Sequence, residues 1–178
     1  MTRKQLLPIV LNALWFQIGW VTCVLFGTGL ALVYVLLTLA LYGLISPFSV
    51  KEWKLMIGIM LIGLITDVTM SLIGILDFPY ESHLPPLWLI TIWFAFATTI
   101  HRSLASIVKN RSLMITFSSI GGALSYFAGV RLSDVSFGFS NTASILGLAL
   151  VWAVVGFVIH AAYINWLKSA DSAAVANV

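Results

Sequence analysis

Long apolar stretches, separated by short polar segments, run through most of the chain. A helix that crosses a membrane needs about 20 mainly apolar residues. The spacing of the stretches predicts six such helices, over residues 6–26, 30–45, 53–76, 87–101, 112–130 and 142–167. We therefore expect an all-α protein in which residues 1–178 form one domain, a polytopic transmembrane bundle of about six helices.

Turn and capping residues mark where several of these helices should begin and end. Gly27-Thr28-Gly29 is the only break between the first two apolar stretches, so these two helices are expected to form a tight hairpin. Ser49 and Glu52 have the spacing of a capping box at the start of the third helix. Arg3 and Lys4 precede the first helix as they would a signal peptide, but that helix is long enough to span and lacks a small-x-small cleavage site. We expect it to be retained.

The charged residues agree with a count of six helices. If the N-terminus is cytoplasmic, eight of the nine basic residues fall on the cytoplasmic side, and only Arg131 lies outside. The outer loops then carry Asp77, Glu81 and Asp134. This is the distribution of the positive-inside rule, and adding or removing one helix would reverse it. Both termini are therefore expected in the cytoplasm.

The composition supports the same class and narrows the function. The chain is 61% hydrophobic and 8% charged, whereas a soluble domain has about 25% charged residues. The net charge of +3 comes from the segments between apolar stretches, where topology accounts for it, so no nucleic-acid partner is expected. Cys23 is the only cysteine, which excludes an intrachain disulfide and a cysteine metal cluster. No other metal or cofactor motif is present, so no cofactor is predicted.

Asp67 is the only acidic residue that lies deep within an apolar stretch. A carboxylate at that depth costs at least a few kcal/mol unless protein or water shelters it. At helical spacing, Gly63, Asp67, Met70 and Gly74 lie on one stripe, with Ser71 beside it. Small residues let a second helix approach closely, which predicts a carboxylate between helices. It is either a buried site for a proton, a cation or a polar ligand, or an Asp that only fixes packing.

Further polar residues within the predicted helices are candidates for the same intramembrane site. They are Asn12, Gln17, Thr98, Ser125 and His160. Buried amides and hydroxyls usually bond between helices or back to their own helix. A His inside a span is either a proton relay or a neutral packing residue. Both interpretations stay open for each of these residues.

The fifth predicted helix carries a ridge of small residues. Gly121, Ser125 and Gly129 recur at intervals of four, and Gly122 lies in the adjacent row. This small-xxx-small pattern is typical of close contact between membrane helices. We expect these glycines, like the two on the Asp67 stripe, at helix-packing positions.

Short motifs spread over nearly the whole chain carry a family resemblance. They are Asn12 with Gln17-Ile-Gly-Trp20, Gly63 with Asp67, Pro85-Pro-Leu-Trp88 with Trp93, Thr98-Thr99 with Ser103, and Gly121-Gly-Ala-Leu-Ser-Tyr126 with Gly129. Together they resemble a family of small bacterial inner-membrane proteins known only as a domain of unknown function. The resemblance implies a multi-pass protein of the bacterial cytoplasmic (inner) membrane. It also implies a link to membrane lipid, because members look like neighbours of lipid-modifying genes of the cyclopropane-fatty-acid synthase type. It supplies no catalytic residue.

Three functional hypotheses fit these observations. The first is a lipid-associated accessory or modifying component with a polar site around Asp67. The second is a small proton- or cation-coupled transporter with Asp67 and His160 as a relay. The third is a structural partner of another inner-membrane protein, docked through the glycine ridge. The expected partners are membrane lipid and, under the third hypothesis, a second membrane protein; whether the protein is an enzyme stays open.

Overall fold

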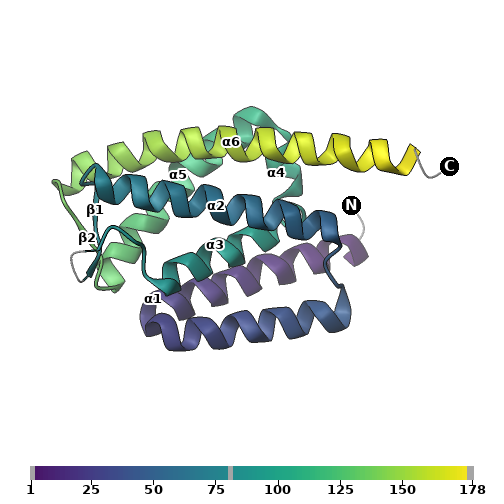
Figure 1. Ribbon diagram of the computed structural model, residues 1–178, viewed down its shortest axis with the longest axis horizontal. Coiled ribbons are helices and arrows are strands. Elements are labelled where there is room, and N and C mark those ends of the chain that lie inside the picture. Colours follow the sequence, from purple (N-terminus) through teal and green to yellow (C-terminus); the bar gives the residue numbers. More distant parts are fainter. Residues whose placement is uncertain (1–2, 80–81, 176–178) are drawn as a thin grey trace.

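The computed structural model describes the backbone of residues 3–79 and 82–175 and the side-chain surroundings of 6–79 and 82–168. It is a helical bundle (Figure 1). The helices are α1 (Arg3–Ile45), α2 (Val50–Leu72), α3 (Leu87–Ile100), α4 (Ala105–Lys109), α5 (Arg111–Leu132) and α6 (Asn141–Val175). Among the described residues, four helices are long and apolar enough to cross a membrane. The predicted class, an all-α transmembrane bundle, is confirmed.

The longest helix, α1, consists of two antiparallel arms joined at Gly27 (Figure 1). Gly27 has φ 66° and ψ −158°, a backbone region that is essentially restricted to glycine. Hydrogen bonds connect the arms, from the Asn12 amide to the Tyr42 hydroxyl at 2.6 Å and from the Trp15 indole to Thr38 at 2.9 Å. The turn falls within the break expected at residues 27–29.

Local sequence explains both ends of α2. The Ser49 side chain accepts from the Glu52 backbone N–H while the Glu52 carboxylate accepts from the Ser49 N–H, so the predicted capping box is present. The helix ends at Leu72, because Gly74 takes φ 75° and turns the chain. The helix therefore ends four residues before the expected boundary at residue 76. Gly74 lies in the turn that follows, and not at the helix-packing position expected for it.

The loops at the far end of the bundle meet in a short antiparallel ladder. Strand β1 (Leu76–Asp77) pairs with β2 (Ser136–Phe137), with Leu76 opposite Phe137 and Asp77 opposite Ser136. The two expected outer loops are thus tied together, which the hydrophobic pattern did not predict. Glu81, expected in the first of these loops, lies outside the described residues.

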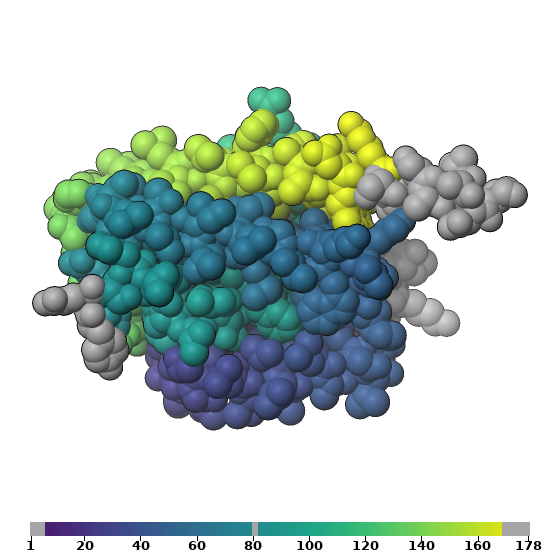
Figure 2. Space-filling view, viewed as in Figure 1, coloured from purple at the N-terminus to yellow at the C-terminus, as the bar shows by residue number. Residues whose placement is uncertain are grey.

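The short helix α3 lies at the centre of the bundle. Ten of its 14 residues are buried, and it packs against α1 and α2. The surrounding helices turn apolar side chains outward, for example Leu36 (67% exposed), Ile65 (66%) and Leu150 (72%). Monomeric soluble proteins rarely expose apolar surface on this scale, so the outer faces suit lipid. In the space-filling view, α6 and α2 form adjacent bands across one such face, and α1 lies along its lower edge (Figure 2).

The two ends of the bundle differ in charge. One end of the bundle holds both termini and the connection between α1 and α2. Lys51 and Lys54 lie at this end, and Arg102 contacts the connection, so we call it the basic end. The opposite end, with the Gly27 turn and the strand pair, carries Asp77 and Asp134; we call it the acidic end. Loops that the sequence assigned to opposite sides of the membrane thus lie at opposite ends of the structure.

Candidate functional site

Asp67 is fully buried at the junction of three helices. The Trp93 indole N–H of α3 donates to one carboxylate oxygen at 2.9 Å. The Tyr126 hydroxyl of α5 donates to the other oxygen. Both oxygens therefore accept a hydrogen bond from an aromatic side chain, and the carboxylate of α2 fixes the positions of one ring on each neighbouring helix.

Two of the glycines expected at packing positions make room for indole rings. A Cβ at Gly63 would overlap the Trp93 ring, and a Cβ at Gly122 would overlap Trp152. The two indoles stack on each other, with centroids 5.2 Å apart and planes 3° from parallel. These glycines therefore allow close contact with aromatic side chains, whereas the small-xxx-small pattern predicted contact with another helix backbone.

The rings that Asp67 holds form part of the wall of a cavity of about 410 Å³. This first cavity lies between the first arm of α1, α3 and α5, and its volume is typical of small-molecule sites. Aromatic residues dominate the wall: Phe16, Trp20, Trp88, Trp93, Phe96, Phe117, Tyr126 and Trp152. Its polar groups, among the described residues, are the side chains of Gln17, Ser118 and Ser125, the Tyr126 hydroxyl, and the indole N–H groups of the four Trp residues in the wall. No charged side chain lines it in that part of the chain.

The small-residue ridge of α5 faces this cavity. A Cβ added at Gly121 or Gly129 would meet no atom within 4 Å, so neither glycine is covered by another helix. Between them, Ser125 accepts a hydrogen bond from the Trp20 indole at 2.9 Å, which joins α5 to α1. Leu124 on the rim is 59% exposed. The cavity therefore opens toward the apolar outer surface of the bundle.

Three of the residues predicted for an intramembrane site lie away from Asp67. The Thr98 hydroxyl donates to the Ala95 carbonyl of its own helix at 2.7 Å. His160 Nδ1 lies 2.7 Å from the Val108 carbonyl, which can only accept, so Nδ1 carries a proton and holds α4 against α6. Asn12 belongs to a separate network at the basic end. Only Gln17 and Ser125 share the first cavity with the ring partners of Asp67.

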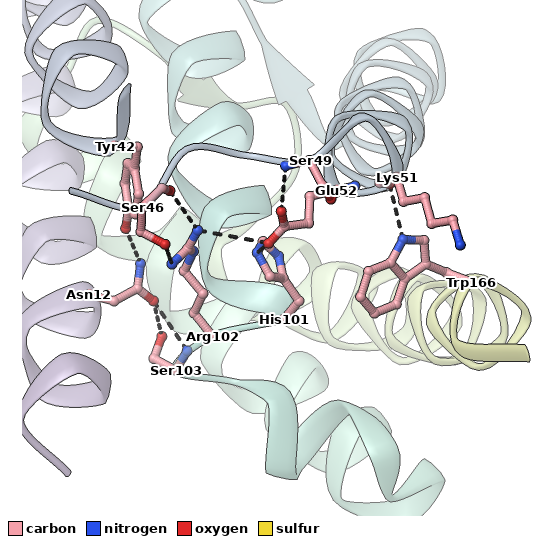
Figure 3. A network of polar contacts seen from close by, with 10 residues as sticks. All are labelled: Asn12, Tyr42, Ser46, Ser49, Lys51, Glu52, His101, Arg102, Ser103 and Trp166. Atoms are coloured by element: carbon pink, nitrogen blue, oxygen red, sulfur yellow. Dashed lines mark hydrogen bonds and ion pairs between the residues drawn. The ribbon is translucent and has the colours of Figure 1, made fainter. Parts of the chain in front are cut away.

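That network is the main polar cluster that the sequence did not predict (Figure 3). Asn12 Oδ1 accepts from the Ser103 hydroxyl at 2.6 Å, while its amide donates to Tyr42. Arg102 reaches the Ser46 hydroxyl and carbonyl, both at 3.3 Å, and lies over the Tyr42 ring at 4.6 Å. The network thus joins both arms of α1 to the end of α3.

An acidic residue and a buried His extend the network to α2. Glu52 Oε1 lies 2.7 Å from His101 Nε2 and 3.8 Å from an Arg102 nitrogen. The His101 side chain is only 7% exposed. Burial lowers the pKa of His101 below its ordinary value of 6.5, and Glu52 opposes this shift only in part. Sequence patterns did not predict this contact, because Glu52 lies on α2 and His101 at the end of α3, far apart in the chain.

The structure offers no grouping suited to a metal ion within its described residues, where no three His, Cys, Asp or Glu side chains come together. Cys23 is buried in the α1 arm that borders the cavity and forms no disulfide. The chemistry available at the site is therefore that of an apolar cavity with a few hydrogen-bonding groups in its wall.

Comparison with known proteins gives a family and no assigned activity. No curated protein and no solved structure matches the chain. The family whose model does match is described as "Protein of unknown function (DUF2878)", over residues 9–158. That range includes Asp67, its two ring partners and the described residues that line the first cavity. The resemblance to a domain of unknown function is confirmed, and the chain belongs to this family.

Proposed function

We propose that this protein binds the hydrocarbon chain of a membrane lipid in the first cavity, as a lipid-associated component of the bacterial inner membrane. The observation that carries the proposal is the cavity itself, which is lined mainly by aromatic and aliphatic groups and opens on an outer face suited to lipid. A hydrocarbon chain can enter such a cavity from the bilayer without crossing water.

The shape of the cavity favours a thin chain over a helix. The Trp20–Ser125 hydrogen bond spans from α1 to α5 at the cavity. A helix with its side chains is about 10–12 Å across, so it could not enter without breaking this bond. The third hypothesis, docking of another membrane protein through the glycine ridge, therefore has less support than lipid binding.

The transporter hypothesis also has less support. Both oxygens of Asp67 are engaged by aromatic donors, and His160 is engaged by a backbone carbonyl of α4. A relay needs groups that exchange protons along a connected path, and no hydrogen bond among the described residues joins these two side chains. An ion would also find no charged group in the described lining of the cavity.

The length of the cavity matches one lipid chain. Along α5 its lining runs from Phe117 to Val130, which is about 20 Å at 1.5 Å per residue. One leaflet contributes about 15 Å, half of the roughly 30 Å hydrocarbon core. The cavity is displaced toward the acidic end, because its lining on α5 begins six residues after Arg111 but reaches to within two residues of Leu132. The positive-inside rule places the basic end in the cytoplasm, so the bound chain belongs to the outer leaflet.

Asp67 has a positioning role in this proposal. It does not line the cavity but bonds two residues that do, Trp93 and Tyr126. A carboxylate is suited to this task because it offers two acceptor oxygens in a fixed geometry. The cost of placing it inside the bundle is thereby offset by two hydrogen bonds that keep the cavity wall in place.

Photolabelling tests the proposal. The detergent-purified protein is illuminated with a lipid that carries a diazirine on its acyl chain, and the labelled residues are mapped by mass spectrometry. We expect labels on the cavity faces of α1, α3 and α5, and their loss in Gly121→Leu, which narrows the cavity by adding a branched side chain to its wall without overlapping the backbone. Gly43→Leu is the matched control, because Gly43 is also exposed on a helix with no atom near its Cβ but does not line the first cavity. Equal labelling of the two variants would contradict the proposal.

A further inference from the structure

We infer that the head group of the bound lipid lies in a second cavity at the acidic end, and that this head group is uncharged or cationic rather than phosphate or carboxylate. The inference rests on the proposed function, because it assumes that the chain of the same lipid occupies the first cavity. It adds the chemical class of the ligand, which the apolar first cavity does not specify.

The second cavity, of about 710 Å³, lies end to end with the first. Val24 and Trp88 line both. On three parts of the chain the lining of the second cavity continues that of the first. On α1 the first cavity is lined by residues 16–24 and the second by 24–28, and at the end of α5 the ranges are 117–130 and 132–134. On α3 the first cavity is lined from residue 96 back to 88, and the second by residues 84–88 at the start of this helix and just before it. The two cavities therefore follow one axis, from the interior of the bundle to its acidic end.

The second cavity is more polar than the first. Its lining includes Thr28, Ser82, Ser133 and Asp134. The Ser82 hydroxyl accepts from the Leu84 N–H at 3.1 Å, and the Ser133 hydroxyl accepts from the Val135 N–H at 3.3 Å. Each hydroxyl keeps its own proton for donation. An apolar cavity that continues into a polar one fits an amphiphile whose chain and head lie along the same axis.

The charge around the second cavity selects the head group. Asp134 is its only charged lining residue in the described part of the chain. Two basic residues neighbour the lining in sequence. Arg131 stacks over Phe127 at 5.2 Å, and His83 Nδ1 lies 3.1 Å from the Ser71 hydroxyl; neither basic side chain lines a cavity. Asp77 on β1 adds a second negative charge at this end. An anionic head would thus meet negative charge with no cation in the lining, whereas a glycerol, amide or ammonium head would find acceptors and donors.

The test compares heads on a constant chain. Three probes carry the same diazirine-bearing chain on a monoacylglycerol, a long-chain amine or a lysophosphatidate. The full-length protein is titrated with each in a nonionic detergent, and the concentration for half-maximal labelling of the first cavity is measured. We expect the glycerol and amine probes to half-saturate at concentrations about fivefold lower than the phosphate probe or lower still. High salt should reduce the difference between the amine and the phosphate.

Matched variants separate a local effect from general charge. Asp134→Asn should reduce the preference for amine over phosphate, since it removes the acceptor that lines the cavity. Asp77→Asn removes the same charge from the same end without touching the lining, and should leave most of the preference. Both side chains are exposed, so neither change threatens folding.

The outcomes distinguish the two proposals. The head-group inference would be overturned, while chain binding stands, by any of three results. The three probes could half-saturate at equal concentrations, the phosphate probe could bind most tightly, or the two Asp variants could have equal effects. Absence of labelling in the first cavity, or labelling that Gly121→Leu does not reduce, would overturn chain binding and the head-group inference with it.

Discussion

Replacing Asp67 by Asn should disturb the cavity more than it disturbs the fold. Asn is nearly isosteric with Asp but offers one acceptor oxygen in place of two. Because an indole N–H can only donate, the oxygen stays with Trp93, and the Asn amide donates to the Tyr126 hydroxyl instead, which replaces a charge-assisted hydrogen bond by a weaker neutral one. Hydrogen bonds between membrane helices contribute about 0.6 kcal/mol on average and about 1.7 at most. An Asp at the centre of a membrane helix costs about 2.5–3.5 kcal/mol on insertion scales. Asp67 lies near one end of α2, and the replacing Asn is itself polar, so the substitution recovers only part of this cost.

These two terms have opposite signs and similar size, so the unfolding free energy of Asp67→Asn should stay within about 2 kcal/mol of the unmodified protein. The Tyr126 ring of the cavity wall is held less firmly, so chain labelling in the first cavity should fall. Denaturant titration in mixed micelles measures the first quantity, and photolabelling measures the second. Trp93→Phe and Tyr126→Phe each remove one bond while keeping the ring, and serve as controls. A loss of more than about 4 kcal/mol, or unchanged labelling, would refute this reasoning.

Further predictions concern the backbone and the basic end. Gly27→Ala should destabilise the α1 hairpin by about 1–3 kcal/mol in thermal or denaturant unfolding, because Ala disfavours φ 66°; Gly29→Ala, with free space at its Cβ, should not. Gly63→Ala should cost about 1–3 kcal/mol by overlap with a buried indole, whereas Gly58→Ala should be neutral or stabilising. His101 has a pKa below its ordinary value of 6.5, so its neutral form favours the folded state. Stability should therefore be full above pH 6.5 and fall as the pH drops through the folded-state pKa, and His101→Gln should flatten the dependence.

The sequence predicted the fold class well because membrane helices obey strong constraints. Every backbone polar group in hydrocarbon must be satisfied within the protein, so long apolar stretches become helices. The break at Gly27 and the capping box at Ser49 are local signals, and the structure places a turn and a helix start there. The pairing of β1 with β2 depends on two loops 60 residues apart in sequence, about which local patterns carry no information.

The candidate site was predicted only in part. The depth of Asp67 in an apolar stretch indicated shelter between helices, and the carboxylate is fully buried. Its partners are Trp93 and Tyr126, which sequence reasoning missed because aromatic residues are common throughout the chain. The small-residue ridge indicated close contact with a helix, yet Gly121 faces a cavity. Helical spacing predicts which residues share a face, but not whether a helix, a ring or a ligand covers it.

The central claim is that the first cavity holds a lipid chain, and native mass spectrometry tests it most directly. The protein is extracted from its own membrane in a mild nonionic detergent and released from the micelle in the spectrometer. We predict a species whose mass exceeds that of the polypeptide by the mass of one lipid. Gly43→Leu should retain this species and Gly121→Leu should lose it. The account would be contradicted if the unmodified protein and both variants carried no lipid, or if both variants retained the lipid equally.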